Sequence, residues 1–379
     1  ALRLPAMPVP DVTTESGRRM LLIHMDGEGF ASRSEFPGNP YAAKILHDKI
    51  IKRYRVPTTI SIIEGETSRQ GQFPKLSSRL EPIARDILAQ PHVEIGSHTF
   101  SHPYDWGRIE RVEGSSDSGY NMPIPGYEFD LQREIAGSIH YIESRLAPHG
   151  KKVKLLQWSG NCNPTINALA ETVSAGVGNI NGGDTVMTRS LPTYTAVAPL
   201  GVQKGPYFQV YAPNQNENVY TNDWTGPFYG FRRGIETFEM TDTPRRLKPI
   251  NIYYHTYAAS KPPSLAALDE AYRWAIKQRP TPVYTSEYVR KVLDFNRVTV
   301  ARTANGWRIR GLGDLRQLRI PANMGFPDLK RSSGIAGYQG HNDQRYLHAG
   351  ASEVDLVLTS QPQNTAYLAN ANAQLHSLE

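Results

Sequence analysis

The stretch Leu21-Leu22-Ile23-His24-Met25-Asp26-Gly27-Glu28-Gly29-Phe30 decides the fold. It is an apolar run of strand length that ends in acidic residues set among glycines. A second stretch, Val93-Glu94-Ile95-Gly96-Ser97-His98-Thr99-Phe100-Ser101-His102, has the same plan and ends in histidines. Buried strands that carry polar residues at their carboxyl ends build the active sites of α/β proteins. We therefore expect these two strand ends to meet.

Strand and helix patterns alternate between residues 20 and 296. Short β-branched or apolar runs predict strands at residues 20–25, 57–63, 93–96, 153–158, 250–255 and 281–284, and residues 178–185 predict a short strand that breaks into a Gly turn. Apolar residues at helical spacing predict helices at residues 41–54, 80–90, 129–146, 165–174, 265–276 and 286–295. This alternation predicts a parallel sheet, either open or closed into a barrel, whose strand ends share one face.

The regions on either side of this span have a different character. Residues 297–379 contain short runs that alternate apolar and polar residues, with Gly, Asn and Pro between them. They predict a small antiparallel domain of the β-sandwich kind. Residues 1–19 are rich in proline and polar residues and are expected to be a lead-in or linker. Residues 107–127, rich in Gly, Ser and Pro, are expected to form a rim loop over a cleft.

The composition excludes several classes of protein. The chain has 379 residues, enough for one large domain and a smaller one. Its formal charge of +6 is spread along the chain, which argues against nucleic-acid binding. No apolar window is long enough to predict a membrane-spanning helix. Cys162 is the single cysteine, so an intrachain disulfide is excluded. Because there is no initiator Met and no apolar secretory segment at the start, we expect a mature form or a piece of a longer protein.

The histidines of the second stretch predict a metal site. His98 and His102 are four residues apart, close enough for both rings to face one centre. Two imidazoles and one carboxylate leave open positions on a divalent ion, as a catalytic site requires. Asp26 is the expected carboxylate. Histidine pairs at this spacing also occur by chance on surfaces, but the buried strand before the pair and the matching Asp-Gly strand end favour a site.

The ordered set of motifs resembles the polysaccharide deacetylases of the NodB-homology type, carbohydrate esterase family 4 and its relatives. The motifs are Asp26-Gly27, the run from Ser97 to His102, and Tyr253-Tyr254-His255, and the resemblance covers about residues 18–296. It implies a distorted parallel (β/α) barrel with a divalent metal, zinc being expected, that hydrolyses N-acetyl groups of a hexosamine polymer. The run from His24 to Phe30 and the sequence Trp158-Ser159-Gly160 are closer to a branch that modifies the Pel exopolysaccharide.

That branch implies further properties. The substrate would be an exopolysaccharide rich in N-acetylgalactosamine, and the location would be periplasmic or otherwise extracytoplasmic. A partner in a polysaccharide export complex is also implied. The β-rich residues 297–379 match the region C-terminal to the deacetylase in this branch.

The resemblance also implies roles for individual residues. Asp26, His98 and His102 become the metal ligands, and the metal activates a water molecule. The common family pattern has two adjacent aspartates, the first of which is the base. Met25 stands at that position here, so Glu28 is the expected general base. The alternative is that Glu28 only orders its loop.

His255 is the expected general acid that protonates the leaving amine; the alternative is a strand-end histidine bonded to the backbone. Either Asp184 or Asp223 is a candidate carboxylate partner for it. The family's Arg-Pro-aromatic motif is missing, and the tripeptide that begins at Trp158 stands near its place. Pyranose rings pack on aromatic side chains, and each such aromatic is also a candidate for plain core. The expected substrate-binding residues are Trp158, Ser159, Asp184, Trp224 and Tyr254.

Other functions remain open from the sequence. A deacetylase for peptidoglycan or chitin-type chains fits the same motifs, although the missing adjacent aspartate argues against it. A non-catalytic polysaccharide-binding barrel is a third hypothesis, with the β-domain as a lectin-like module. The retained Asp26, His98, His102 and His255 argue against loss of activity. A hydrolase of cyclic amides is the fourth, and it lacks the polymer cleft that the aromatic loops suggest.

Overall fold

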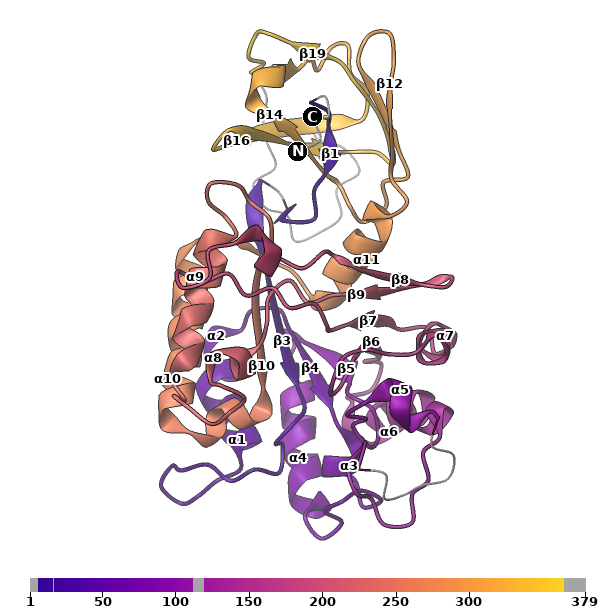
Figure 1. The fold of residues 1–379 in the computed structure, drawn as a ribbon, viewed down its shortest axis with the longest axis vertical. Helices are drawn as coiled ribbons and strands as arrows, with labels where there is room; N and C mark the ends of the chain where they lie inside the picture. The colour runs from indigo at the N-terminus through magenta and orange to yellow at the C-terminus, as the bar shows by residue number, and fades with distance from the viewer. Residues whose placement is uncertain (1–5, 16, 112–118, 365–379) are drawn as a thin grey trace.

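A curled parallel sheet forms the centre of the computed structural model, which describes residues 6–15, 17–111 and 119–364 (Figure 1). Its main strands run in the order β10-β3-β4-β5-β6-β7, every neighbouring pair being parallel. Their bounds are β3 (Arg18–Asp26), β4 (Thr58–Ile62), β5 (Val93–Ser97), β6 (Val153–Gln157), β7 (Gly178–Ile180) and β10 (Ile250–His255). This confirms the expected distorted parallel (β/α) barrel, in an open form with β10 and β7 at its edges.

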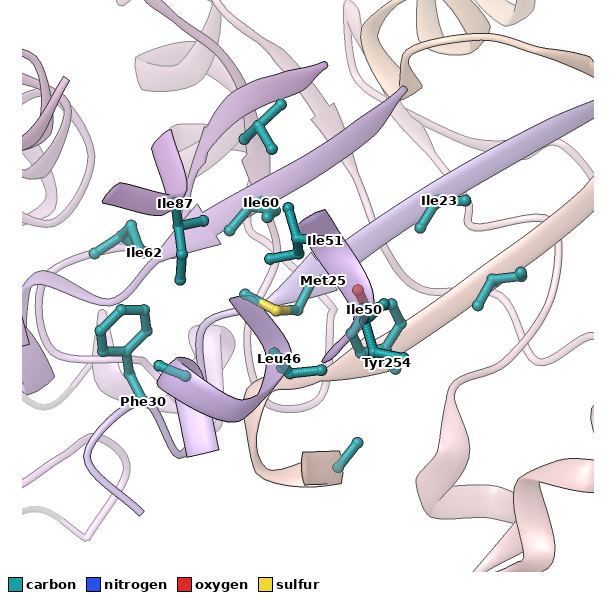
Figure 2. Close-up of a cluster of buried hydrophobic side chains, with 14 of the residues drawn as sticks. Ile23, Met25, Phe30, Leu46, Ile50, Ile51, Ile60, Ile62, Ile87 and Tyr254 are labelled. Carbon is teal, nitrogen blue, oxygen red and sulfur yellow. The ribbon is translucent and has the colours of Figure 1, made fainter. Parts of the chain in front are cut away.

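The alternation of side chains along β3 separates two environments. Leu21, Ile23 and Met25 point to the outer face and pack under the helices (Figure 2). His24 and Asp26 lie on the opposite face, inside the barrel, because successive strand side chains alternate. β10 pairs with β3 so that His255 stands opposite Asp26. The carboxyl ends of these strands therefore carry polar groups into the barrel mouth.

The helices that cover the outer face lie close to their predicted positions. Two of the predicted helices, at residues 41–54 and 129–146, contain π-helical turns. The bounds are α1 (Ala42–Leu46), η1 (His47–Ile51), α2 (Lys52–Tyr54), α4 (Ser77–Leu88), η2 (Arg133–Gly137), α6 (Ser138–Tyr141), η3 (Ile142–Leu146), α7 (Ile166–Ser174), α10 (Pro262–Lys277) and α11 (Thr285–Phe295). The apolar sides of all these helices except α11 form one buried cluster with the outer face of the sheet. α11 packs instead with the inward-facing Met20 and Leu22 of β3.

The connections between the main strands carry further short elements. These are α3 (Glu64–Thr67), α5 (Trp106–Ile109), η4 (Tyr194–Ala196), α8 (Glu217–Tyr220), η5 (Gly230–Arg233), α9 (Gly234–Met240) and η6 (Thr256–Ser260), with the hairpin β8 (Gly201–Lys204) and β9 (Tyr207–Val210). The segment after β9 crosses the open side of the barrel. The backbone N–H of Ala212 donates to the carbonyl of Gly182 beyond β7, at 3.1 Å. The Asn214 side chain accepts from the N–H of Asn251 in β10, also at 3.1 Å. These bonds bridge the two edge strands.

The C-terminal region is antiparallel throughout, as predicted. One sheet has the order β1-β14-β17-β16, a second β12-β13-β18, and β15 pairs with β19. The bounds are β12 (Thr299–Arg302), β13 (Trp307–Arg310), β14 (Gln317–Pro321), η7 (Ala322–Met324), β15 (Phe326–Pro327), β16 (Ile335–His341), β17 (Gln344–Ala349), β18 (Glu353–Leu356) and β19 (Leu358–Thr359). Their apolar side chains share one cluster with Met20 and Leu22 of β3 and with Val289 of α11, which joins this region to the barrel.

Two short segments of the expected lead-in, residues 1–19, pair with strands of the C-terminal region and of the barrel. β1 (Val9–Pro10) pairs with β14, β2 (Thr14–Glu15) pairs with β3, and β11 (Thr281–Pro282) also pairs with β3. β1 and β2 are too short to show a periodic pattern, which is why the sequence does not reveal them, whereas β11 lies within the strand predicted at residues 281–284. None of the helices in the described part of the chain has the length and apolarity needed to cross a lipid bilayer.

Candidate metal centre

The two strand ends meet, and Glu28 lies at the centre of the group. Its Oε1 is 2.8 Å from Nε2 of His102, and its Oε2 is 2.7 Å from Nε2 of His255. Nε2 of His98 is 3.7 Å from Oε2 of Glu28. The three histidines are buried. The β3, β5 and β10 ends therefore place a carboxylate and three imidazoles within reach of one another.

Three buried atoms that face the centre, Glu28 Oε2, His98 Nε2 and His102 Nε2, make no hydrogen bond of normal geometry. Their close approaches are the carboxylate–imidazole contacts given above. Buried polar atoms rarely remain unpartnered in folded proteins. One ligand atom each from Glu28, His98 and His102 lies within 4.8 Å of the others. A shared divalent cation would satisfy all of them and retain open coordination positions.

Asp26 lies deeper and is held by neutral donors. Its carboxylate accepts from the hydroxyl of Tyr253 at 2.6 Å, from Nδ2 of Asn181 at 3.1 Å, and from the side-chain amide of Gln157. The nitrogen of His98 nearest to it is Nδ1, at 3.7 Å. That nitrogen lies 2.8 Å from the Gln157 carbonyl, its hydrogen-bond acceptor. Asp26 therefore faces the side of His98 opposite to the unpartnered Nε2.

The structure thus does not gather the expected ligands Asp26, His98 and His102 around one point. Asp26 instead forms a second group with Glu28 and His255, whose ligand atoms are within 4.8 Å of one another. Strand alternation directs Asp26 into the barrel, whereas the turn at Gly27 brings Glu28 back over the histidines. A Cβ at Gly27 would lie 2.8 Å from the backbone nitrogen of Ile63, so this close turn requires glycine.

His255 is oriented by a carboxylate that the sequence did not reveal. Glu217 Oε1 accepts from the His255 backbone N–H at 2.9 Å and lies 3.1 Å from Nδ1. Burial disfavours the charged ring, but Glu28 and Glu217 outweigh it and raise the pKa of His255 well above its usual value. Neither expected partner is the carboxylate at this ring: Asp184 is exposed and accepts from Gln215 at 2.7 Å, and Asp223 is also exposed.

Two further buried carboxylates hold the loops that carry the ligands. Glu66 of α3 accepts from the N–H groups of Gly29 and Ala31, at 2.8 and 3.0 Å. Burial raises the pKa of Glu66 to about 7. Glu134 of η2 accepts from the N–H groups of Phe100 and Ser101, at 3.0 and 2.8 Å. Glu66 comes three residues after the end of the strand predicted at residues 57–63, which is a weak signal; Glu134 and Glu217 lie in no motif.

The backbone around the centre is strained. Thr99 and His102 have φ angles of 70° and 52°, and Asn181, which bonds Asp26, has a φ of 98°. Non-glycine residues adopt this left-handed region rarely, and such strain concentrates at functional sites. The His102 N–H donates to the Thr99 hydroxyl at 3.1 Å, which holds the histidine turn in place.

Most of the predicted sugar-binding residues belong to the core. Trp158 is fully buried, packs edge-on against Trp106 at 5.1 Å, and donates from Nε1 to Asn179 at 3.1 Å. Ser159 is buried and donates to the carbonyl of Pro103 at 2.8 Å. Tyr254 is buried on the outer face of β10, opposite to its neighbour His255 (Figure 2). These side chains cannot contact a sugar in this conformation.

Trp224, another of the predicted sugar-binding residues, is only half-buried. Separately, a cavity opens beside the candidate metal centre. The cavity has a volume of about 420 Å³ and is lined by Glu28 and His102 together with Glu66, Phe73 and Tyr104. Because Glu28 and His102 line it, the cavity gives access to the candidate metal site.

Replacing Glu66 by Gln is expected to weaken metal binding by about 10- to 100-fold, as is typical when a group supporting a metal ligand is removed. The amide retains a single acceptor oxygen, so one of the N–H bonds that hold the Glu28 loop is lost. The measurement is competition with a chromogenic chelator. Glu143→Gln is a matched control, since Glu143 accepts from the N–H of Val153 at the opposite end of β6. Equal affinities in both variants would contradict the role of Glu66.

Comparisons with known proteins give structural similarities at low sequence identity. No family model matches the chain, and no curated protein matches it. The 4-α-glucanotransferase of Thermococcus litoralis is similar with a TM-score of 0.46 and 13% identity, over 73% of this chain and 40% of that one. The Bc1960 peptidoglycan N-acetylglucosamine deacetylase has a TM-score of 0.40 and 14% identity, over 75% and 92%. A Streptococcus mutans CE4 esterase has a TM-score of 0.39 and 12% identity, over 72% and 87%.

These similar proteins differ in activity, and this chain spans less than half of the glucanotransferase. The chemistry is therefore argued from the residues of the site.

Proposed function

We propose that this protein is a metal-dependent N-deacetylase acting on a hexosamine-containing polysaccharide. The observation that carries the proposal is the convergence of Glu28, His98 and His102, with buried unpartnered atoms, next to a His255 that a carboxylate orients. Metal-assisted amide hydrolysis requires a set of cation ligands and, beside it, an oriented general acid such as His255.

Glu28, His98 and His102 would hold the divalent metal, with zinc expected from the resemblance. When bound, such a metal polarises the acetamide carbonyl and lowers the pKa of a water molecule. Asp26 is then the carboxylate next to the ligands, and it takes the proton from the attacking water. The geometry thus favours exchanging the roles that the resemblance implies for Asp26 and Glu28.

His255 donates the proton that the leaving nitrogen needs. Its Nδ1 faces Glu217 and its Nε2 faces the centre, so a proton on Nε2 points towards the reacting amide. Addition of water to the carbonyl and cleavage of the C–N bond give acetate and a free amine on the sugar. The product polymer is therefore more cationic than the substrate.

For the substrate, we propose a Pel-like exopolysaccharide rich in N-acetylgalactosamine. The support is the resemblance of the run from His24 to Phe30, of Trp158-Ser159-Gly160 and of Tyr253-Tyr254-His255 to the deacetylase region of PelA, which acts in the periplasm. A periplasmic location and a partner in a polysaccharide export complex belong to the same proposal. Peptidoglycan or chitin-type chains are the competing substrates, and a non-catalytic binding barrel is the competing function.

The test measures acetate release from N-acetylgalactosamine and N-acetylglucosamine oligomers, together with bound metal. The wild-type protein is expected to hold stoichiometric metal and to release acetate faster from the galactosamine series. His98→Ala is expected to lose both metal and activity, whereas the exposed His149→Ala keeps both. Faster release from the glucosamine series would favour the competing substrates. If the protein contains no metal and binds the polymer without releasing acetate, the proposed enzymatic activity is wrong.

A further inference from the structure

An exposed aromatic ring adjoins one side of the centre. Tyr104 is 42% exposed, and its ring lies edge-on to His102 with centroids 5.3 Å apart. It lines the 420 Å³ cavity together with Glu28 and His102. An exposed tyrosine that touches a candidate metal ligand offers a surface on which a ligand at the centre can extend.

A second set of rings begins at the other imidazole that contacts Glu28. Tyr257 stacks on His255 with centroids 4.7 Å apart and planes 10° apart. Trp224 packs on Tyr257 at 4.7 Å, and Phe228 packs on Trp224 at 5.1 Å. We call Tyr257, Trp224 and Phe228 the aromatic row. None of the three side chains is fully buried, so each ring keeps part of its surface exposed.

The two aromatic surfaces start from different ends of one carboxylate. His102 contacts Oε1 of Glu28 and His255 contacts Oε2. Tyr104 therefore extends from one end of Glu28 and the aromatic row from the other. A ligand bound at Glu28 can reach aromatic rings in two directions.

The loop that presents Trp224 is strained. Asn222, Asp223 and Trp224 have successive φ angles of 53°, 50° and 60°. For a bulky residue such as Trp this backbone is unfavourable, and strain of this kind persists at ligand clamps. Bonds to Thr221 hold the loop: its hydroxyl accepts from the Trp224 N–H at 3.3 Å and its carbonyl from the Gly226 N–H at 2.8 Å.

We propose that Tyr104 and the aromatic row are two sugar subsites flanking the hexosamine whose acetamide is hydrolysed. This inference rests on the proposed function and deepens it: the substrate is an internal unit of a linear chain, with a neighbouring sugar on each side. Aromatic rings offer large, rigid contact surfaces to the apolar faces of such sugars. Binding at these remote units positions the reacting acetamide.

The test measures the dissociation constants of N-acetylated hexosamine oligomers from the monomer to the hexamer. It uses the Asp26→Asn background, so that ligand is not consumed. The affinity is expected to rise with chain length. Adding Trp224→Ala or Tyr104→Ala is expected to weaken hexamer binding by roughly 5- to 10-fold, with a loss that grows with chain length. Trp307→Ala, a half-buried tryptophan in β13, is the matched control and should leave the series unchanged.

The outcomes separate the two proposals. Affinities that do not depend on chain length, or a loss in Trp224→Ala that is the same for monomer and hexamer, would overturn the subsites even if the wild-type protein releases acetate. Chain-length-dependent binding that both substitutions reduce supports the subsites even if no acetate is released. In that second case only the deacetylase activity would fail.

Discussion

Replacing Asp26 by Asn is expected to lower kcat by about 10²- to 10⁴-fold, the usual contribution of a general base, while bound metal stays stoichiometric. Asn accepts hydrogen bonds poorly from the donors Tyr253, Asn181 and Gln157 and cannot take a proton from water. Since Asp26 lies away from the unpartnered Nε2 of His98, its loss leaves the ligand atoms in place. Acetate release and metal analysis are the measurements.

Glu28→Gln is the paired experiment, and the opposite result is expected. The carboxylate whose two oxygens face the imidazoles of His98 and His102 becomes a neutral amide, so metal affinity should fall together with activity. Asp48→Asn is the control, because Asp48 is an exposed carboxylate paired with lysines on the outer helix. If Asp26→Asn loses the metal and Glu28→Gln retains it, Asp26 is the ligand, as the resemblance implies, and the exchange of roles is wrong.

Glu217→Gln is expected to lower kcat by about 10²- to 10⁴-fold with little change in metal content, because it removes oriented acid catalysis. The Glu217 carboxylate accepts from both the backbone N–H and the ring of His255. A Gln side chain is uncharged and can present its NH₂ group to Nδ1, so it no longer stabilises the doubly protonated ring that donates a proton from Nε2. The measurement is single-turnover acetate release by metal-loaded protein.

The control for Glu217 is Glu236→Gln on α9. Glu236 accepts from the N–H of Arg189 at 2.9 Å but does not touch the centre within the described structure, so its activity should equal that of the wild-type protein. An active Glu217→Gln variant would show that another group supplies the proton. Loss of metal in that variant would instead show that Glu217 supports the ligands.

The sequence could predict which residues gather at the candidate metal centre, because most of them lie at or just after the ends of strands. Asp26, His98 and His255 each close a buried apolar run, and parallel strands bring their carboxyl ends to one face. Glu28 and His102 follow within four residues of such an end, so they had to lie nearby. The alternation of side chains along β10 places His255 inside the barrel and its neighbour Tyr254 outside. The sequence pattern alone therefore argued against Tyr254 as a sugar-binding residue.

The roles within the centre were not predictable, because they depend on contacts between distant parts of the chain. Glu66 holds the Glu28 loop, Glu134 the histidine turn and Glu217 the His255 ring, each from 33 to 38 residues away. No local pattern marks these carboxylates, since their hydrogen bonds are mostly to backbone N–H groups and place no demand on nearby residues. Trp158 likewise became core through its packing on Trp106.

By itself, the sequence determined the parallel barrel, its β-rich C-terminal neighbour and the cluster of acid and imidazole groups at one end. These features arise from local periodicity, which the chain carries in every short segment. Only the tertiary structure decided which carboxylate faces the unpartnered imidazole nitrogens. That choice depends on the close turn at Gly27 and on buried carboxylates from other elements, and neither leaves a mark in the local sequence.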